Sequence, residues 1–396
     1  MKKVGIVSCY FQHNYGSMLQ ALATQMVLDK LNYKNETINI SGFNHEIGKA
    51  KLLYFAKASL TSDILLSKFG MAKNVLIKKL SKNEYAVMSK VRAEKFDAFS
   101  KKCFRLSPKY ESKEELGNNC EDRYSSVLVG SDQLWLPGNI AADYYTLNFV
   151  PKTVNTIAYA TSFGQSSLPK DSAQKAEIFL KKIRHIGVRE ESGQKLVKEI
   201  ANRNVPVVCD PTLLFTGEEW LSTQKEEPII EEKYILCYFL GNNPPHREFA
   251  KRLREATGCK IVALTHLDEF VKSDEGYADD TPYDVDPADF LNLIRNAQYV
   301  CTDSFHCSVF SMLYKKTFFT FRRYARKTKS STNSRLDTLF RLAGVTGRVL
   351  EGTENIQKCL CMEIDYDHVH MNLAKIREKS YQYLQRALKD KESTDL

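Results

Sequence analysis

Short apolar runs that end at polar turns recur along the chain. Runs of this length, bounded by glycine, serine or aspartate, indicate strands that are buried on both faces of a parallel sheet. Between them, residues 17–31 place Leu19, Leu22 and Met26 near helical spacing, with Ser17 as the predicted cap. This alternation is typical of doubly wound α/β domains. We predict strands at residues 4–8, 36–40, 126–129, 156–159, 186–188, 205–208, 234–240, 260–264, 297–301 and 317–321.

Two domains are expected, because 396 residues are too many for one ordinary core. The glutamate-rich stretch 228–233 is the predicted linker. We therefore predict an N-terminal Rossmann-like domain at 1–228, a C-terminal Rossmann-like domain at 229–370, and a terminal helix at 371–396 that packs back on the first domain. Residues 43–105 form a mostly helical, basic excursion within the first domain.

The net charge of +9 is distributed unevenly, with lysines and apolar residues interleaved over 49–82 and Asp63 as the single acid there. This pattern fits a solvated helical face, or a surface that rests on anionic lipid. We expect no nucleic-acid partner, because no zinc-finger spacing or RNA-binding aromatic motif is present. We predict a cytoplasmic protein, because the sequence shows neither a signal-peptide core nor a long apolar span. The ten cysteines are scattered, which predicts reduced thiols and no metal.

The turn after residues 297–301 carries Asp303, Ser304 and His306 at the predicted start of a helix. In open α/β sheets, ligands collect at the carboxyl ends of strands, and helix N-terminal amides there favour an anion. His306 is the best candidate for proton transfer, since histidine is the side chain that ordinarily exchanges a proton near neutral pH. The alternatives are a structural histidine, or a histidine that activates Cys307 or Cys9 as a nucleophile.

Two turns of the first domain carry further candidates. Asn14, Tyr15 and Gly16 follow the first strand, with Gln20 one turn into the helix, and an ordinary tight turn is the alternative there. The stretch 130–135, which contains Ser131, offers Asp132 and Gln133 to sugar hydroxyls, Trp135 as an apolar platform, and Asp132 as a general base. Its alternative is a capping aspartate with a core tryptophan.

Arginines are the expected anion ligands. Arg189 ends a predicted strand and suits a carboxylate or phosphate, unless it pairs with Glu190, Glu191 or Asp210. A second cluster follows the His306 turn, and its alternative is a solvated loop. This cluster includes Arg322, Arg323 and Arg335.

In this order, these motifs resemble the polysaccharide pyruvyl transferase family. The resemblance implies a GT-B-like arrangement of two Rossmann-like domains with a cleft between them. It also implies that phosphoenolpyruvate is the donor and that the product is a pyruvate ketal on a glycan or lipid-linked oligosaccharide. The implied role is in the assembly of cell wall, capsule or exopolysaccharide. The residues that carry it are Asn14-Tyr15-Gly16 with Leu19-Gln20, Gly130 to Trp135, Tyr159 to Gly164, Val188-Arg189-Glu190, Asp210-Pro211-Thr212, Thr302 to His306, and Ser334-Arg335.

Under this resemblance, His306 is the expected acid, Asp132 the base, and Arg189 and Arg335 the anion clamps, with no cofactor and no metal. Many members carry Arg-Leu-His where this chain has Ser304-Phe305-His306, so Arg189, Arg322, Arg323 or Arg335 would supply the donor-binding guanidinium. Two other functions fit the same residues: a GT-B glycosyltransferase that uses a nucleotide-sugar, and a non-catalytic glycan-binding protein. The expected substrate-binding residues are Arg189, Arg335, Ser304, Asn14, Tyr15, Gly16, Gln20, Ser131, Gln133, Trp135, Arg322, Arg323 and Ser334.

Overall fold

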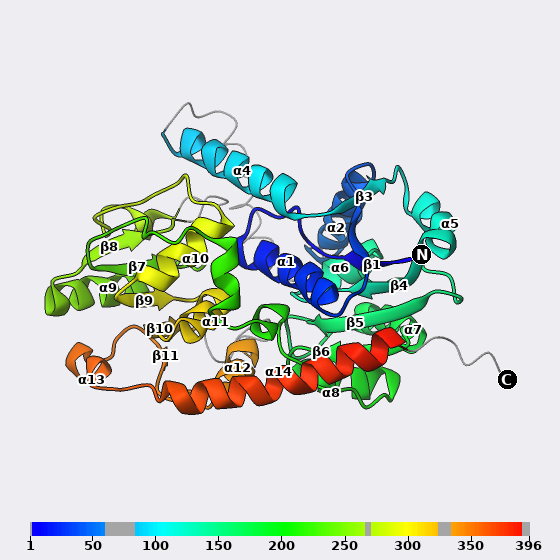
Figure 1. Ribbon diagram of the computed structural model, residues 1–396. Helices are drawn as coiled ribbons and strands as arrows, with labels where there is room; N and C mark the ends of the chain where they lie inside the picture. The colour runs from blue at the N-terminus through cyan, green and yellow to red at the C-terminus, as the bar shows by residue number, and fades with distance from the viewer. Residues whose placement is uncertain (1, 60–83, 266–270, 324–333, 390–396) are drawn as a thin grey trace.

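The computed structural model describes residues 2–59, 84–265, 271–323 and 334–389, and contains two parallel sheets flanked by helices (Figure 1). This is the predicted α/β class. The strands of the first sheet are β1 (Lys3–Val7), β2 (Asn35–Asn39), β3 (Leu106–Lys109), β4 (Tyr124–Val129), β5 (Asn155–Thr161) and β6 (His185–Val188). Those of the second sheet are β7 (Tyr234–Tyr238), β8 (Lys260–Ala263), β9 (Tyr299–Thr302), β10 (Thr317–Phe321) and β11 (Val349–Leu350).

The strand order of each sheet reverses at one position. The first sheet has the order β3-β2-β1-β4-β5-β6, so its reversal lies between β1 and β4. The second has the order β11-β10-β9-β7-β8, so its reversal lies between β7 and β9. At such a point the loops that follow the two strands diverge to opposite faces of the sheet and leave a crevice at its carboxyl edge. Each half therefore offers one crevice for a ligand.

The predicted strands are confirmed to within two residues at either end, with one exception. The strand predicted at 205–208 is wrong, since only Val207 forms a bridge, to Val188. Pro206 has no N–H group and cannot extend a ladder there. The sequence analysis missed β3, a short edge strand that contains Pro108 and is mostly exposed, and the two-residue edge strand β11.

Helix α1 begins at Tyr15, two residues before the predicted start, because Asn14 rather than Ser17 is its cap. The side chain of Asn14 accepts a hydrogen bond from the Ser17 N–H at 3.1 Å. Helices flank the two sheets (Figure 1). They are α1 (Tyr15–Lys30), α2 (Asn44–Ser59), α4 (Glu84–Cys103), α5 (Lys113–Arg123), α6 (Pro137–Ala142), α7 (Lys170–Lys182), α8 (Glu191–Ala201), α9 (Pro244–Thr257), α10 (Pro287–Asn296), α11 (Phe305–Leu313), α12 (Ser334–Ala343), α13 (Ile356–Leu360) and α14 (Tyr366–Lys389), with 3-10 turns η1 (Pro211–Leu214), η2 (Glu219–Thr223) and η3 (Lys272–Asp274).

The predicted excursion at 43–105 contains α2 and α4, while residues 60–83 between them lie outside the described residues. Helix α2 packs on α6 in the first half. Helix α4 reaches the second half, where the buried Arg92 donates hydrogen bonds to the backbone oxygens of Thr265, Pro282 and Tyr283 at 2.8, 2.8 and 3.0 Å. The excursion therefore links the two halves as well as covering the first.

The two halves share one continuous apolar core, which includes residues of α1 and of α10 and α11. Tyr15 stacks on Phe290 with ring centroids 4.5 Å apart, and its hydroxyl donates to the backbone oxygen of Val285 at 3.1 Å. Helix α14 runs beneath the second half and returns to the first (Figure 1). There Tyr383 donates to the backbone oxygen of Ala158 at 2.9 Å. These contacts fix the carboxyl edge of the first sheet in position relative to the carboxyl edge of the second.

Candidate active site

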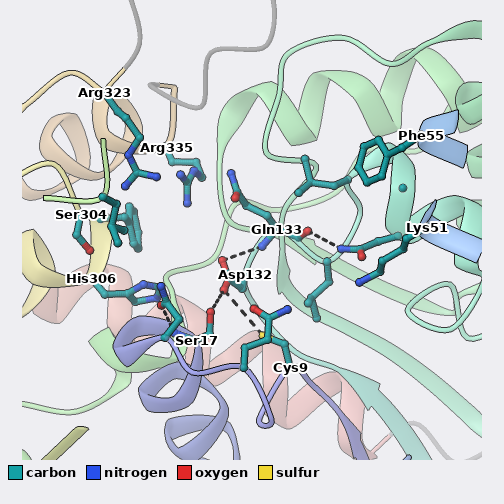
Figure 2. Close-up of a pocket in the computed structure, with 18 residues that line it drawn as sticks. Cys9, Ser17, Lys51, Phe55, Asp132, Gln133, Ser304, His306, Arg323 and Arg335 are labelled. Carbon is teal, nitrogen blue, oxygen red and sulfur yellow. Dashed lines mark hydrogen bonds between the residues drawn. The ribbon is translucent and has the colours of Figure 1, made fainter. Parts of the chain in front are cut away.

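One cavity, of about 380 Å³, lies where the crevices of the two sheets meet. Loops after β1 and β4 line it from the first half, and loops after β7, β9 and β10 line it from the second. Figure 2 shows the residues of the second half on one side of this cavity and side chains of α2 on the other. The predicted site residues that line it are Asn14, Asp132, Gln133, Ser304, His306, Arg323 and Arg335.

Asp132 occupies the turn after β4 with a left-handed backbone, at a φ of 83°. This conformation is strained for a residue with a side chain. Its carboxylate accepts hydrogen bonds from the Ser17 hydroxyl at 2.7 Å and the Gln133 N–H at 2.8 Å. Burial raises the pKa of Asp132, but the positive charges of Arg189 and His306 outweigh burial and hold the pKa below its ordinary value. Asp132 is therefore an oriented carboxylate at neutral pH.

His306 is the second residue of α11, whose cap is Ser304. Its Nε2 lies 3.4 Å from Oδ2 of Asp210, which belongs to the other half of the molecule. Its Nδ1 faces α1, where a Cβ added to Gly16 would lie only 2.1 Å away. The absence of a side chain at Gly16 therefore lets α1 approach the imidazole. The glycine predicted to admit a ligand instead admits the candidate catalytic histidine.

Arg189 lies behind the cavity rather than on its wall, so its role as an anion clamp stays a prediction. Its guanidinium donates to Asp210 at 2.8 Å and lies 3.7 Å from Asp132 and 3.8 Å from Glu190. The salt-bridge alternative is therefore the observed one, because a buried guanidinium requires anionic partners from the protein itself. Burial raises the pKa of Asp210, but His306 and Arg189 lower it well below its ordinary value.

Two other guanidinium groups do line the cavity. Arg323 donates to the backbone oxygen of Asp303 at 3.1 Å, and its buried Nε has no hydrogen-bond partner in the described part of the chain. The guanidinium carbon of Arg335 lies 5.8 Å from the ring centroid of Phe305, which Arg189 approaches to 4.7 Å. Burial, together with the like charges of Arg189 and Arg323, lowers the pKa of Arg335 to about 10. Such an accumulation of positive charge favours an anionic ligand.

Trp135 does not line the cavity, so its prediction as a sugar platform is wrong. It is fully buried against Phe163 and Phe179, and its Nε1 donates to the backbone oxygen of Tyr145 at 3.1 Å. The indole N–H is satisfied within the core, which leaves no group for a ligand. The alternative of a core tryptophan therefore describes this residue.

Five further predicted contacts also lie off the cavity wall. Tyr15 packs between the halves, as described above. Gln20 donates to the Ser17 backbone oxygen at 2.8 Å, and Ser131 donates to Asp210 at 2.8 Å. Arg322 pairs with Asp337 at 2.8 Å, and Ser334 accepts a hydrogen bond from Ser192 at 3.3 Å. These side chains are used by internal contacts and position the site from behind.

The sequence analysis missed two residues of α2 that line the cavity, Lys51 and Phe55. The mixture of lysines and apolar residues over 49–82 was read as a surface pattern. No local signal indicates that this helix folds back over the turn after β4.

The cysteine alternative is disfavoured by the surroundings of both thiols. Burial raises the pKa of Cys307 to about 12 and raises that of Cys9 further, so neither is a thiolate at neutral pH. Among the residues that the structure describes, no group of three or more metal-ligating side chains is placed to hold a metal ion. Within the same described ranges, no helix is both long and apolar enough to cross a bilayer.

Solved structures with a similar fold include two UDP-N-acetylglucosamine 2-epimerases and a glycosyltransferase. A UDP-N-acetylglucosamine 2-epimerase aligns at 12% identity and a TM-score of 0.53, covering 100% of this chain and 99% of that one. The UDP-GlcNAc 2-epimerase of Methanocaldococcus jannaschii aligns at 15% identity and a TM-score of 0.47, covering 98% and 99%. The glycosyltransferase SnogD of Streptomyces nogalater aligns at 10% and 0.43, covering 98% of each chain. The first of these alignments, at 12% identity and a TM-score of 0.53, shows the fold alone, which is the GT-B arrangement expected above.

No curated protein sequence matches the chain. The family model described as polysaccharide pyruvyl transferase matches residues 14–323, which include the turns after β4, β7 and β9. The chain therefore belongs to the polysaccharide pyruvyl transferase family.

Proposed function

We propose that this protein transfers the pyruvate unit of phosphoenolpyruvate to two hydroxyls of a glycan sugar, forming a ketal and releasing phosphate. One observation carries the proposal: a carboxylate, an imidazole and two guanidinium groups converge on one cavity from both halves of the molecule. These are Asp132, His306, Arg323 and Arg335. They provide the acid, the base and the fixed positive charge that this chemistry requires.

The two guanidinium groups are the proposed ligands of the donor. Phosphoenolpyruvate carries a phosphate and a carboxylate, and Arg323 and Arg335 stand beside Ser304, where many family members carry an arginine. Arg189 and Arg322 do not line the cavity, and each pairs with a carboxylate at 2.8 Å, whereas Arg323 lines the cavity and lies 3.4 Å from the Asp303 carboxylate, so Arg189 and Arg322 are the poorer substitutes. An anion between Arg323 and Arg335 would offset the repulsion that lowers the pKa of Arg335.

In the proposed reaction, protonated His306 gives its proton to the methylene carbon of phosphoenolpyruvate. The electron pair of the double bond forms the new C–H bond, and the adjacent carbon becomes cationic. A sugar hydroxyl attacks this carbon and passes its proton to Asp132. Phosphate then leaves with the electrons of its C–O bond, and the second hydroxyl closes the ring. In sum, one hydroxyl proton ends on the new methyl group and the other on phosphate.

The exposed face of α2 supports a further part of this proposal, contact with an anionic membrane surface that presents a lipid-linked acceptor. Leu52 and Leu53 are 70% and 54% exposed, and Lys49 and Lys57 flank them on the same helix. Apolar side chains among lysines favour the interface of an anionic bilayer. The rest of the predicted stretch, 60–82, lies outside the described residues.

Thermal unfolding with phosphoenolpyruvate or UDP-glucose tests the donor. A ligand that binds only the native state stabilises it by about 2.7 kcal/mol at 100 times its Kd, so phosphoenolpyruvate should raise the Tm. A rise with UDP-glucose and none with phosphoenolpyruvate would instead support the nucleotide-sugar glycosyltransferase. Glycan binding without consumption of either donor would support the non-catalytic protein.

His306→Ala tests the acid. Phosphate release from phosphoenolpyruvate in the presence of acceptor glycans should fall by roughly 100-fold or more, because general acid catalysis contributes about that much. The exposed His45 of α2 provides the matched control, and His45→Ala should keep the rate. A His306→Ala rate close to that of the unchanged protein would remove His306 from proton transfer.

A further inference from the structure

The cavity wall opposite Arg323 and Arg335 is formed by one face of α2 (Figure 2). Lys51 and Phe55 are four residues apart, so both side chains project from the same face of the helix. Phe55 lies against α6, where a Cβ added to Gly138 would be 3.2 Å from its Cζ. The packing of α2 on α6 therefore fixes this wall at the turn that carries Asp132 and Gln133.

Lys51 differs from the neighbouring lysines of its helix. Lys49 and Lys57 are exposed, whereas Lys51 is half-buried and its Nζ lies 5.8 Å from the ring centroid of Tyr145. Within the described ranges, no carboxylate lies within ion-pair distance of this ammonium. Burial lowers the pKa of Lys51, which shows that its charge is poorly solvated there. A partly buried ammonium that has no carboxylate partner among the described residues is unfavourable, and a bound anion would relieve this.

Two neighbours of Lys51 fit a sugar rather than a free ion. The buried Nε2 of Gln133 has no hydrogen-bond partner among the described residues, so it is a donor available to a ligand oxygen. Phe55 is 39% exposed and, beside its edge contact with the ring of Tyr54, presents apolar surface to the cavity. The wall therefore combines a cation, an amide donor and an aromatic surface.

We propose that Lys51, Phe55 and Gln133 form the acceptor subsite, and that it takes a glycan bearing a negative charge, as a sugar carboxylate or a sugar phosphate. This inference rests on the proposed function, in which Arg323 and Arg335 are occupied by the two anionic groups of the donor. Lys51 lies across the cavity from them and is left for an anion of the acceptor.

Glucuronic acid, glucose 1-phosphate and neutral glucose are suitable probes, titrated by calorimetry. The Arg335→Met variant is the starting protein, because its weakened donor side leaves Lys51 as the main cation for a sugar anion. Adding Lys51→Met should weaken binding of at least one anionic probe by roughly 5-fold, because a partly exposed ion pair contributes about 1 kcal/mol. The affinity for glucose should not change. Adding Lys57→Met, the matched exposed control, should change none of the three.

The probe that responds to Lys51→Met identifies the anion, a carboxylate with glucuronic acid or a phosphate with glucose 1-phosphate. Phe55→Leu should weaken all three sugars, since it removes the aromatic surface. The proposal is overturned if neither anion binds more tightly than glucose, or if Lys51→Met and Lys57→Met behave alike. Because no phosphoenolpyruvate is present, failure here is distinct from failure of the donor experiment on the unchanged protein.

Discussion

Replacing Gly16 by alanine places a methyl carbon where His306 now lies. The new Cβ would be 2.1 Å from Nδ1, 2.5 Å from Cγ and 2.9 Å from Cβ of His306. Non-bonded atoms of this kind pack at about 3.5 Å, so the gap to Nδ1 must widen by about 1.4 Å. Rotation of the ring does not remove the overlap with the histidine Cβ. Helices α1 and α11, which belong to different halves, must therefore move apart.

The expected free-energy change follows from two opposing effects. Overpacking of a buried contact costs about 1–3 kcal/mol. Alanine gains at most about 1 kcal/mol over glycine in a helix, and less in the first turn, where Gly16 lies. We therefore expect Gly16→Ala to lower the free energy of unfolding by about 1–2 kcal/mol. It should also weaken phosphoenolpyruvate-dependent stabilisation, since it displaces His306 and the start of α11.

Gly48 of α2 provides the matched control. It is an exposed helical glycine, and among the described residues no heavy atom would lie within 4 Å of an added Cβ. Gly48→Ala should raise the free energy of unfolding by about 0.5–1 kcal/mol, the opposite sign to Gly16→Ala. Urea unfolding followed by fluorescence of the buried Trp135 and Trp220 measures both. If Gly16→Ala is as stable as Gly48→Ala and still responds fully to phosphoenolpyruvate, α1 does not contact His306 as described.

Three other changes have defined outcomes. Arg335→Met should stabilise the ligand-free protein by about 1 kcal/mol, because the lowering of the pKa of Arg335 from 12.5 to about 10 corresponds to at most about 3 kcal/mol and water screens a half-buried group. The same variant should abolish the Tm rise with phosphoenolpyruvate. An unchanged rise would contradict the donor assignment. Asp210→Asn breaks a buried ion pair and should destabilise the protein by about 3–5 kcal/mol at pH 7. The folded pKa of Asp210 is depressed, so its carboxylate stabilises the protein above its ordinary pKa near 3.9, and this stabilisation is lost as the pH falls below that value. Asp210→Asn should therefore lose less stability than the unchanged protein between about pH 4 and pH 2. Parallel loss of stability in the two proteins would refute this. Changing Leu52 and Leu53 together to serine should reduce flotation with phosphatidylglycerol vesicles, whereas Val87→Ser, an equally exposed change on α4, should not; equal binding by both variants would exclude α2 as the contact.

Local patterns were sufficient for the elements and for the chemistry at their ends. Buried parallel strands are apolar on both faces, so runs such as the one before Asp303 are visible in the sequence alone. The polar turns after β4 and β9 were also recognised, and Asp132, Ser304 and His306 do line one cavity. These features depend on neighbours within about ten residues, which the sequence displays directly.

Only the tertiary structure decided which polar side chains remain available to a ligand. Arg189 and Trp135 have the residue types expected at a sugar site, yet Asp210 pairs with the first and the core of the first half encloses the second. Lys51 and Phe55 reach the cavity because α2 packs on α6, a contact between segments some 90 residues apart. Burial and pairing are set by such distant contacts. The sequence by itself therefore determined most of the strands, the polar turns that follow them and the family, while the packing of the two halves determined the site.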